Sequence, residues 1–348
     1  MYDNMKRRYF RPFIILAMAV ASLMAVACEK VLEVDEPANR QMVLNAVPTA
    51  GQRAFVNFSY TRFFLDSSNF HPVDGADIVL DVNGQRMRPD SVSRCNYFFP
   101  HILQEGDSLS ISIDAAGHRV QAHTYVPLIP DVDSMVAVPF VSPSFNFLTV
   151  SFTLSDHPDI AEYYSIAVKE RDSGARFNEW TQMLDTVDTV YTTYFLVPYN
   201  PEITSNEVNP YIPLGGYLYS RIMFLDRLID GQSPNIQLYI MQLVDTNEVE
   251  PFKHEYFVDV ESMTRERFRY QLSVATQNSM TSFFAEQGQA YSNVEVDGAT
   301  GLGVFAGNAK RRFHIDETNA VNPVSQSSFV PDTQLLHLFK RLRTPQRR

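Results

Sequence analysis

Polar and apolar side chains alternate with a period of two through much of residues 41–127. This period is typical of strands that bury every second side chain. The clearest runs lie at 54–61, 77–82, 108–114 and 120–126. Asn83-Gly84 follows the second run and favours a hairpin turn, because both residues tolerate positive φ. Since the runs are short, recur about every ten residues and include no helical period, they predict an immunoglobulin-like β-sandwich over residues 41–127.

A second region of alternation follows Pro127 and Pro130, which mark a linker. Strands are expected at 148–154, 164–168, 235–243, 291–296, 302–305 and 310–315. We therefore predict a mainly β chain with a second β-rich domain over residues 131–330. The basic stretch at 331–348 is expected to form a C-terminal tail.

One segment of the second region has a helical period instead. Phe268, Leu272, Ala275 and Ser279 fall on one stripe of a helix. Ser262 is suited to cap the first turn, and a glycine at position 288 is suited to end the helix. The second domain is therefore expected to carry one long helix over residues 262–287.

The start of the chain departs from both patterns. Basic residues from Lys6 to Arg11 precede an apolar block over 13–27, and Cys28 follows directly. This order is typical of a secretory signal peptide over residues 1–27, and the block is shorter than the roughly twenty apolar residues that a membrane span needs. A cysteine at this junction indicates a bacterial lipoprotein, in which Cys28 carries lipid and residues 28–40 form an acidic tether. The site Ala25-Val26-Ala27 also fits ordinary signal peptidase, which releases a soluble protein.

Composition narrows the class of protein. Hydrophobic residues make up 45% and charged residues 20% of the chain, as in globular proteins. The formal net charge of −11 argues against nucleic acid as a partner, because phosphates require clustered Lys and Arg. Anionic headgroups also repel an acidic body, so membrane attachment is expected to depend on the lipid on Cys28. With Cys28 modified, Cys95 has no partner for an intramolecular disulfide, and we expect it to be a small buried side chain in a strand at 94–99.

Motifs with catalytic or metal-binding chemistry are incomplete in this sequence. Asp156-His157-Pro158-Asp159 offers metal ligands but fits an ordinary turn between strands. His254-Glu255 begins like a zinc-protease motif, but Val258 stands where the second histidine is needed. Residues 298–303 are glycine-rich, lack the order of a phosphate loop and lead into a strand. We expect no enzyme activity, no metal and no cofactor. The enzyme alternative is a hydrolase with carboxylates brought together from separate strands.

Tyrosines and prolines are concentrated in the segment between Thr181 and Ser220, which is expected to be irregular. Tyrosine has an apolar ring and a polar tip, and it suits contacts with sugars, peptides or proteins. Long irregular segments on a β scaffold are often functional. The candidate binding residues are Tyr191, Tyr194, Tyr199, Tyr211 and Tyr217. Packing of these rings over the core of the second domain is the other interpretation, and the sequence leaves both open.

Several segments carry a family resemblance when they are taken in chain order. They are Cys28-Glu29-Lys30, residues 120–127, Phe224-Leu225-Asp226-Arg227-Leu228-Ile229-Asp230-Gly231, the predicted helix, Tyr291-Ser292-Asn293 and Gly301-Leu302-Gly303-Val304-Phe305. Together they resemble the domain-of-unknown-function family 4249, envelope lipoproteins of certain diderm bacteria, over nearly the whole mature chain. The family often has paired glycines before the leucine of the last motif, whereas Ala299-Thr300-Gly301 stands here, so we expect that loop to differ.

The resemblance implies a lipid anchor, an immunoglobulin-like first domain, a second β-rich domain and association with TonB-dependent outer-membrane receptors. It supplies no catalytic residues. We therefore expect a lipid-anchored outer-membrane protein, facing the periplasm or the cell surface, that acts as a non-catalytic binding or accessory subunit of such a receptor. The alternatives are a lipid-anchored hydrolase acting on polysaccharide or peptide, and a structural adhesion module.

Overall fold

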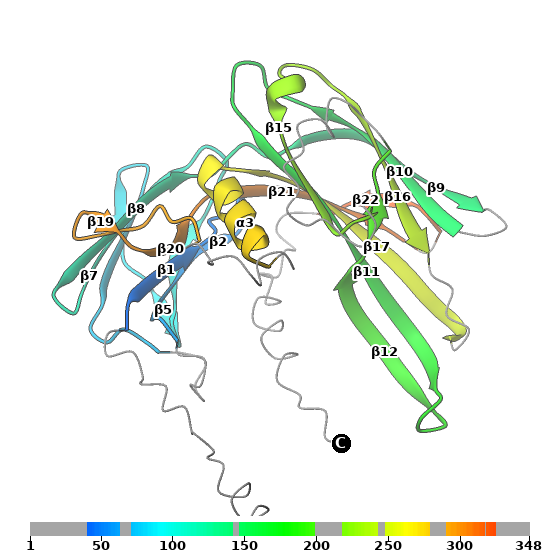
Figure 1. The fold of residues 1–348 in the computed structure, drawn as a ribbon, viewed down its shortest axis with the longest axis horizontal. Coiled ribbons are helices and arrows are strands. Elements are labelled where there is room, and N and C mark those ends of the chain that lie inside the picture. Colours follow the sequence, from blue (N-terminus) through cyan, green and yellow to red (C-terminus); the bar gives the residue numbers. More distant parts are fainter. Residues whose placement is uncertain are drawn as a thin grey trace, which may run out of the picture. The chain divides into compact units, whose positions relative to one another are not determined.

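The computed structural model describes residues 40–62, 71–141, 146–198, 218–242, 248–278, 290–316 and 318–324. The predicted signal peptide at 1–27, nearly all of the tether at 28–40 and the basic tail at 331–348 lie outside these ranges. Strands dominate the described part of the chain, so the expectation of a mainly β fold is confirmed (Figure 1).

Two sheets packed face to face form the first sandwich. One sheet contains β1 (Met42–Ala46), β2 (Arg53–Tyr60), β6 (Asn96–Ile102) and β5 (Ser91–Ser93), in that spatial order. The other contains β8 (His118–Tyr125), β7 (Ser108–Ala115), β3 (Asp77–Val82) and β4 (Gln85–Met87). In immunoglobulin lettering these orders are A-B-E-D and G-F-C-C′, so the immunoglobulin-like prediction is confirmed.

The period-two pattern explains the core of this sandwich. Ile78, Leu80 and Val82 of β3 are buried, while the residues between them are more exposed. They share one hydrophobic cluster with Phe58 of β2 and Phe99 of β6, which belong to the opposite sheet. The hairpin from β3 to β4 turns at the predicted Asn-Gly pair, and both of its residues have positive φ.

C-terminal strands complete this first sandwich. β20 (Leu302–Phe305) pairs in parallel with β1, and β18 (Glu295–Val296) pairs with β8 and with β19 (Ala299–Thr300). The assignment of all of residues 131–330 to the second domain is therefore wrong for this segment. The physical reason is that β1 and β8 expose unpaired backbone groups at the sheet edges, which the returning chain covers.

Two of the family-like motifs make this return possible. A Cβ atom at Gly303 would lie 1.9 Å from the main-chain oxygen of Leu44, so only glycine allows β20 to approach β1 so closely. Asn293 bonds to the main chain of Phe305 in both directions, since its Nδ2 donates to the Phe305 oxygen at 2.7 Å and its Oδ1 accepts from the Phe305 nitrogen at 3.0 Å. The asparagine motif thus holds the glycine motif in place.

The second sandwich also has two sheets. The first has the order β14 (Leu218–Tyr219), β13 (Phe195–Leu196), β16 (Asn235–Gln242), β10 (Asn146–Ser155) and β9 (Asp131–Val141). The second has the order β12 (Met183–Thr192), β11 (Tyr163–Asn178), β17 (Glu248–Met263), β21 (Asn308–Ile315) and β22 (Val321–Pro323), and β15 (Arg221–Leu225) also pairs with β11. One hydrophobic cluster joins Leu148, Val150 and Phe152 of the first sheet to Ile166 and Val258 of the second.

Helix α3 (Arg265–Asn278) is the long helix that the sequence predicts, but it begins later than expected. Ser262 does not cap it, because β17 continues through Met263 with a neighbouring strand on each side. The Ser262 hydroxyl instead donates a hydrogen bond to the main-chain oxygen of Leu128. The helix starts after Thr264, whose main-chain oxygen accepts a hydrogen bond from the main-chain nitrogen of Phe268 at 3.0 Å. Residues 279–287 of the prediction lie outside the described ranges.

A buried ion-pair network lies on the face of the β11–β17–β21 sheet that is turned away from the hydrophobic cluster of the second sandwich. Glu261 lies 2.8 Å from Arg221, 3.5 Å from Arg267 of α3 and 3.7 Å from Lys310 of β21. Burial raises the pKa of the Glu261 carboxyl, but the three cations lower it more, and the resulting pKa lies well below the ordinary value. The network therefore links α3 to the sheet.

Candidate functional site

Strand register brings a set of polar side chains together beyond the apolar core of the second sandwich. On β11, Glu170 and Asp172 follow the buried residues Ile166 and Val168 on the same face. On β17, Tyr256 lies opposite Glu170, and His254 lies opposite Asp172. On the inward face of the sheet, apolar side chains are thus followed by charged ones at this point.

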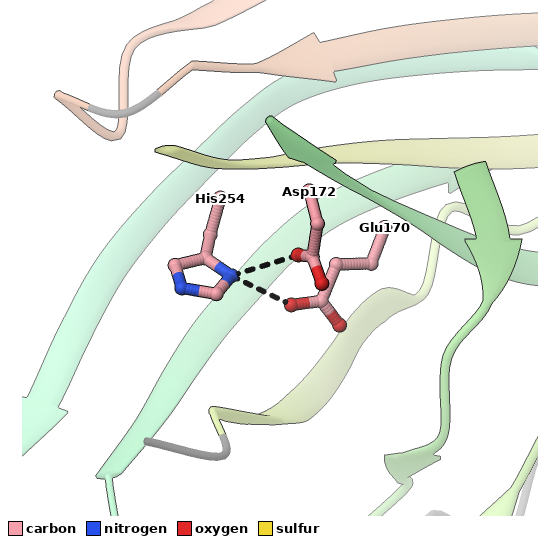
Figure 2. A group of neighbouring side chains, drawn as sticks. All are labelled: Glu170, Asp172 and His254. Atoms are coloured by element: carbon pink, nitrogen blue, oxygen red, sulfur yellow. Dashed lines mark hydrogen bonds and ion pairs between the residues drawn. The ribbon is translucent and has the colours of Figure 1, made fainter. Parts of the chain in front are cut away.

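Three of these side chains form the candidate site, the carboxylate–histidine cluster of Glu170, Asp172 and His254 (Figure 2). His254 Nδ1 lies 2.9 Å from Asp172 Oδ1 and 3.2 Å from Glu170 Oε1. Both carboxylates are buried, and the imidazole is partly exposed. Each residue offers one ligand atom, and all three atoms lie within 4.8 Å of one another. The cluster could therefore hold a metal ion.

A local irregularity adds a third carboxylate to the cluster. The pairing of β11 with β17 shifts between Ser173 and Ala175, where β17 contains extra residues. A Cβ at Gly174 would lie 2.7 Å from the ring of Phe252, so glycine makes room for the bulge. Because of this bulge, the Glu248 side chain lies beside the cluster, with its Oε2 3.1 Å from His254 Nε2.

The carboxylates have further hydrogen-bond partners. Asp172 Oδ2 accepts from the Tyr191 hydroxyl of β12 at 3.1 Å and from Arg176 Nη2 at 3.3 Å. Glu170 Oε1 accepts from the Tyr256 hydroxyl at 3.3 Å. Arg176 also contacts Glu248 at 3.1 Å. These contacts fix the orientation of both carboxylates on the sheet.

The negative charge of the cluster changes the acidity of its neighbours. The hydrogen bond with Glu170, opposed by burial and reinforced by Glu248 and Asp172, raises the pKa of His254 to about 9. Burial, together with the carboxylates of Glu170 and Asp172, raises the pKa of the Tyr191 and Tyr256 hydroxyls. Without a metal ion the imidazole is therefore protonated at neutral pH, and both tyrosines remain hydrogen-bond donors.

Sequence motifs do not reveal this cluster. His254-Glu255 begins like a zinc-protease motif, which requires a helix, whereas His254 lies on a strand whose partners are far away in the sequence. The local signal is the pair of acids at positions 170 and 172, which follow Ile166 and Val168 on the same face of one strand.

The candidate tyrosines separate into different environments. Tyr191 lies on β12 and bonds to Asp172, so this part of the expected irregular segment is a strand. Tyr194 is exposed just beyond that strand. Tyr199, Tyr211 and Tyr217 lie outside the described residues. The structure thus joins Tyr191 to the carboxylate–histidine cluster and leaves the proposed tyrosine surface as a prediction.

The turn at Asp156-His157-Pro158-Asp159 is held by acids from the Phe224–Gly231 motif. The Glu162 nitrogen donates to Asp226 at 2.5 Å, and the Asp159 nitrogen donates to Asp230 at 3.1 Å. Asp156 accepts from the Gly231 nitrogen at 3.0 Å and from the Tyr164 hydroxyl at 2.8 Å. Burial raises the pKa of Asp156 to about 6. These carboxylates close a turn between β10 and β11, as the sequence predicts.

Two other candidates, Cys95 and the glycine-rich segment at 298–303, belong to turns of the first sandwich. Cys95 lies in the turn between β5 and β6 rather than inside a strand, and it is fully buried, which raises the pKa of its thiol. The glycine-rich segment at 298–303 forms the hairpin from β18 to β19 and then enters β20.

Within the described ranges, no helix has the length and hydrophobicity that a membrane crossing requires.

Two β-sandwiches, with the first closed by C-terminal strands, define a mainly β protein of two modules. The chain matches the family described as "Domain of unknown function (DUF4249)" over residues 29–313, and it belongs to that family. No curated protein matches the chain significantly.

Two solved structures give weak similarity. One is reported as "The Enterococcus faecalis MSCRAMM ACE binds its ligands by the collagen Hug Model"; it is 11% identical, with a TM-score of 0.21, and the match covers 77% of this chain and 96% of that chain. The other is reported as manganese lipoxygenase of Gaeumannomyces graminis with a partial structure of zonadhesin of Komagataella pastoris; it is 10% identical, with a TM-score of 0.19, and the match covers 82% and 98%. Similarity this low carries no argument about function.

Proposed function

We propose that this chain is a lipid-anchored protein of the outer membrane that acts as a non-catalytic binding or accessory subunit of a TonB-dependent receptor. The junction at Cys28 supports the anchor, and the resemblance of the sequence motifs supports the receptor as partner. The structure adds a surface that suits protein contact, and this surface is the observation that carries the proposal.

That surface is the tip of the hairpin formed by β11 and β12, defined here as residues 178–184 and called the hairpin tip (Figure 1). Trp180 is 97% exposed, Met183 67% and Leu184 60%. Trp180 is also the single tryptophan of the chain. Tryptophan and methionine are enriched at protein interfaces, and large apolar side chains this exposed at one hairpin tip suit contact with a protein partner.

Edge strand β9 offers a second exposed apolar row. Val136, Val138 and Phe140 alternate along the strand and are each more than half exposed. Natural sheets usually protect such edges with charge or with a covering element. Two exposed apolar features on the second sandwich favour a protein partner over a purely solvated role.

Replacing Trp180, Met183 and Leu184 together with serine should greatly reduce recovery of a receptor, because the exposed apolar surface that contacts it is removed. The measurement is affinity purification of the lipidated chain from its native membrane in mild detergent, with quantitative mass spectrometry of the proteins that co-purify. A matched control replaces Val92 and Ile102 with serine, since both are exposed apolar residues of the first sandwich. Unchanged receptor recovery with the tip variant would contradict the proposal, as would the absence of any membrane protein with the parent chain.

Cys28→Ser should abolish fatty-acid labelling of the chain in cells and delay its processing. The reason is that the thiol of Cys28 is the attachment point for lipid in the proposed anchor. Metabolic labelling with a fatty-acid analogue, followed by gel analysis, provides the measurement. Equal labelling of the variant and the parent would show that the anchor assignment is wrong, whereas Cys95→Ser serves as the control that keeps full labelling.

A second candidate is a lipid-anchored hydrolase, which one observation favours. Glu170 and Asp172 are two buried carboxylates side by side, the residue type that glycoside hydrolysis uses. In the structure both carboxylates are held by histidine and tyrosine side chains. Cleavage of a polysaccharide or peptide by the purified parent chain, lost in Glu170→Gln, would favour this function over the accessory role.

A further inference from the structure

The spacing of the carboxylate–histidine cluster matches the coordination shell of one metal ion. Ligand atoms held about 2.1 Å from one ion lie roughly 3.0–3.4 Å apart in octahedral or tetrahedral geometry. His254 Nδ1 lies 2.9 Å from Asp172 Oδ1 and 3.2 Å from Glu170 Oε1. These two distances are close to that range, and all three ligand atoms lie within 4.8 Å of one another, so one ion could bind them after side-chain adjustment.

Neighbouring residues orient each ligand in the way that metal sites require. His254 Nε2 faces Glu248 Oε2 at 3.1 Å, and donation of the Nε2 proton to that carboxylate leaves Nδ1 as the ligand atom. Tyr191 and Arg176 donate to Asp172 Oδ2, which leaves Oδ1 turned toward the histidine. The Tyr256 hydroxyl donates to Glu170 Oε1, the proposed ligand oxygen itself, and holds that carboxylate beside the histidine. Every proposed ligand thus has an outer partner that fixes its rotamer.

The charge of these groups is balanced by a divalent cation. Glu170, Asp172 and Glu248 carry three negative charges when ionised, and Arg176 carries one positive charge. With a neutral His254 the sum is −2, and a divalent ion brings it to zero. Because Glu170 and Asp172 are buried, such neutralisation is favourable.

We propose that Glu170 Oε1, Asp172 Oδ1 and His254 Nδ1 bind one divalent transition-metal ion of the zinc class. The imidazole disfavours Ca²⁺ and Mg²⁺, which prefer oxygen ligands, and the two carboxylates disfavour soft ions such as Cu⁺. Three protein ligands suit Zn²⁺, whose fourth position a water molecule can fill. The ion joins β11 to β17 near the bulge, where the β11–β12 hairpin leaves the second sandwich.

The test is titration of the full chain, stripped with a chelator and carrying no histidine tag, with Zn²⁺ and separately with Ca²⁺ at pH 7.5. We expect one Zn²⁺ per chain by isothermal titration calorimetry and at least tenfold weaker binding of Ca²⁺. Asp172→Asn and His254→Gln should abolish stoichiometric binding, and Glu248→Gln should weaken it about 10- to 100-fold, because it removes the partner of Nε2. His314→Gln is the matched control, since this histidine pairs with Glu255 instead of the cluster.

X-ray absorption of the parent chain with Zn²⁺ gives a readout that does not depend on the folding of a variant. One imidazole and only nitrogen or oxygen ligands at about 2.0–2.2 Å are the expected first shell. Several imidazoles, or a sulfur ligand, would overturn the assignment. Failure of the parent to bind Zn²⁺ stoichiometrically, or unchanged binding by His254→Gln, would overturn it as well. None of these outcomes bears on the receptor contact of the hairpin tip.

Discussion

Replacing Gly303 with alanine should lower the free energy of unfolding by about 3 kcal/mol or more. Gly303 has φ +106°, a region that side-chain-bearing residues rarely adopt, and its Cβ would lie 1.9 Å from the Leu44 oxygen. The backbones of β1 and β20 would have to separate, with loss of their parallel pairing. Denaturant unfolding followed by far-ultraviolet circular dichroism is the measurement, because the fully exposed Trp180 is a poor fluorescence reporter of unfolding.

Gly298→Ala is the matched control for this prediction. Gly298 also has positive φ, +81°, but a Cβ there would meet nothing within 4 Å. It therefore isolates the conformational cost, which we expect to be about 1 kcal/mol. Equal losses of stability in the two variants would show that close pairing of β20 with β1 does not explain the glycine in the last family-like motif.

Glu261→Gln should lower the free energy of unfolding by about 3 kcal/mol at pH 7. The substitution keeps the shape of the side chain but removes the carboxylate that Arg221, Arg267 and Lys310 share in a buried position. Removing one partner from a buried ionic group leaves charge without compensation, which is more costly than loss of a surface pair. Thermal and denaturant unfolding of the parent and the variant provide the comparison.

The pH dependence of this difference follows from the lowered pKa of Glu261. The carboxyl binds protons more weakly in the folded chain than in the unfolded chain, where its ordinary pKa is 4.5. Its stabilising contribution is therefore complete above about pH 4.5 and is lost as the pH falls toward the folded-state pKa. The gap between parent and Glu261→Gln should narrow on acidification. A gap that stays constant down to the acid transition would contradict the assigned network.

Local patterns predicted those parts of the fold that depend on local chemistry. The strand at 77–82 and its Asn-Gly turn were predicted correctly because alternation and positive φ are properties of the residues themselves. The start of α3 was predicted wrongly, since serine favours a helix cap but Ser262 is held in β17 by strands on both sides. Pairing of β20 with β1 could not be read from either segment, because an open sheet edge exists only once the sandwich has formed.

The candidate site depends on the same non-local register. Glu170 and Asp172 share a strand face by their spacing alone, but nothing in their neighbourhood indicates which strand lies beside them. The contact with His254 requires the antiparallel pairing of β11 with β17, and the contact with Glu248 requires the bulge opposite Gly174. Irregular pairing of this kind is a tertiary property, which explains why sequence motifs gave no metal ligands.

The contact of the hairpin tip with a membrane receptor is the central claim, and site-specific photo-crosslinking in living cells tests it most directly. A photoreactive amino acid in place of the exposed Met183 should form a crosslink to an outer-membrane receptor, identified by mass spectrometry. The same amino acid in place of Ser110, an exposed residue of the first sandwich, is the control and should give no such crosslink. Crosslinking of the receptor from neither position, or with equal yield from both, would contradict the account.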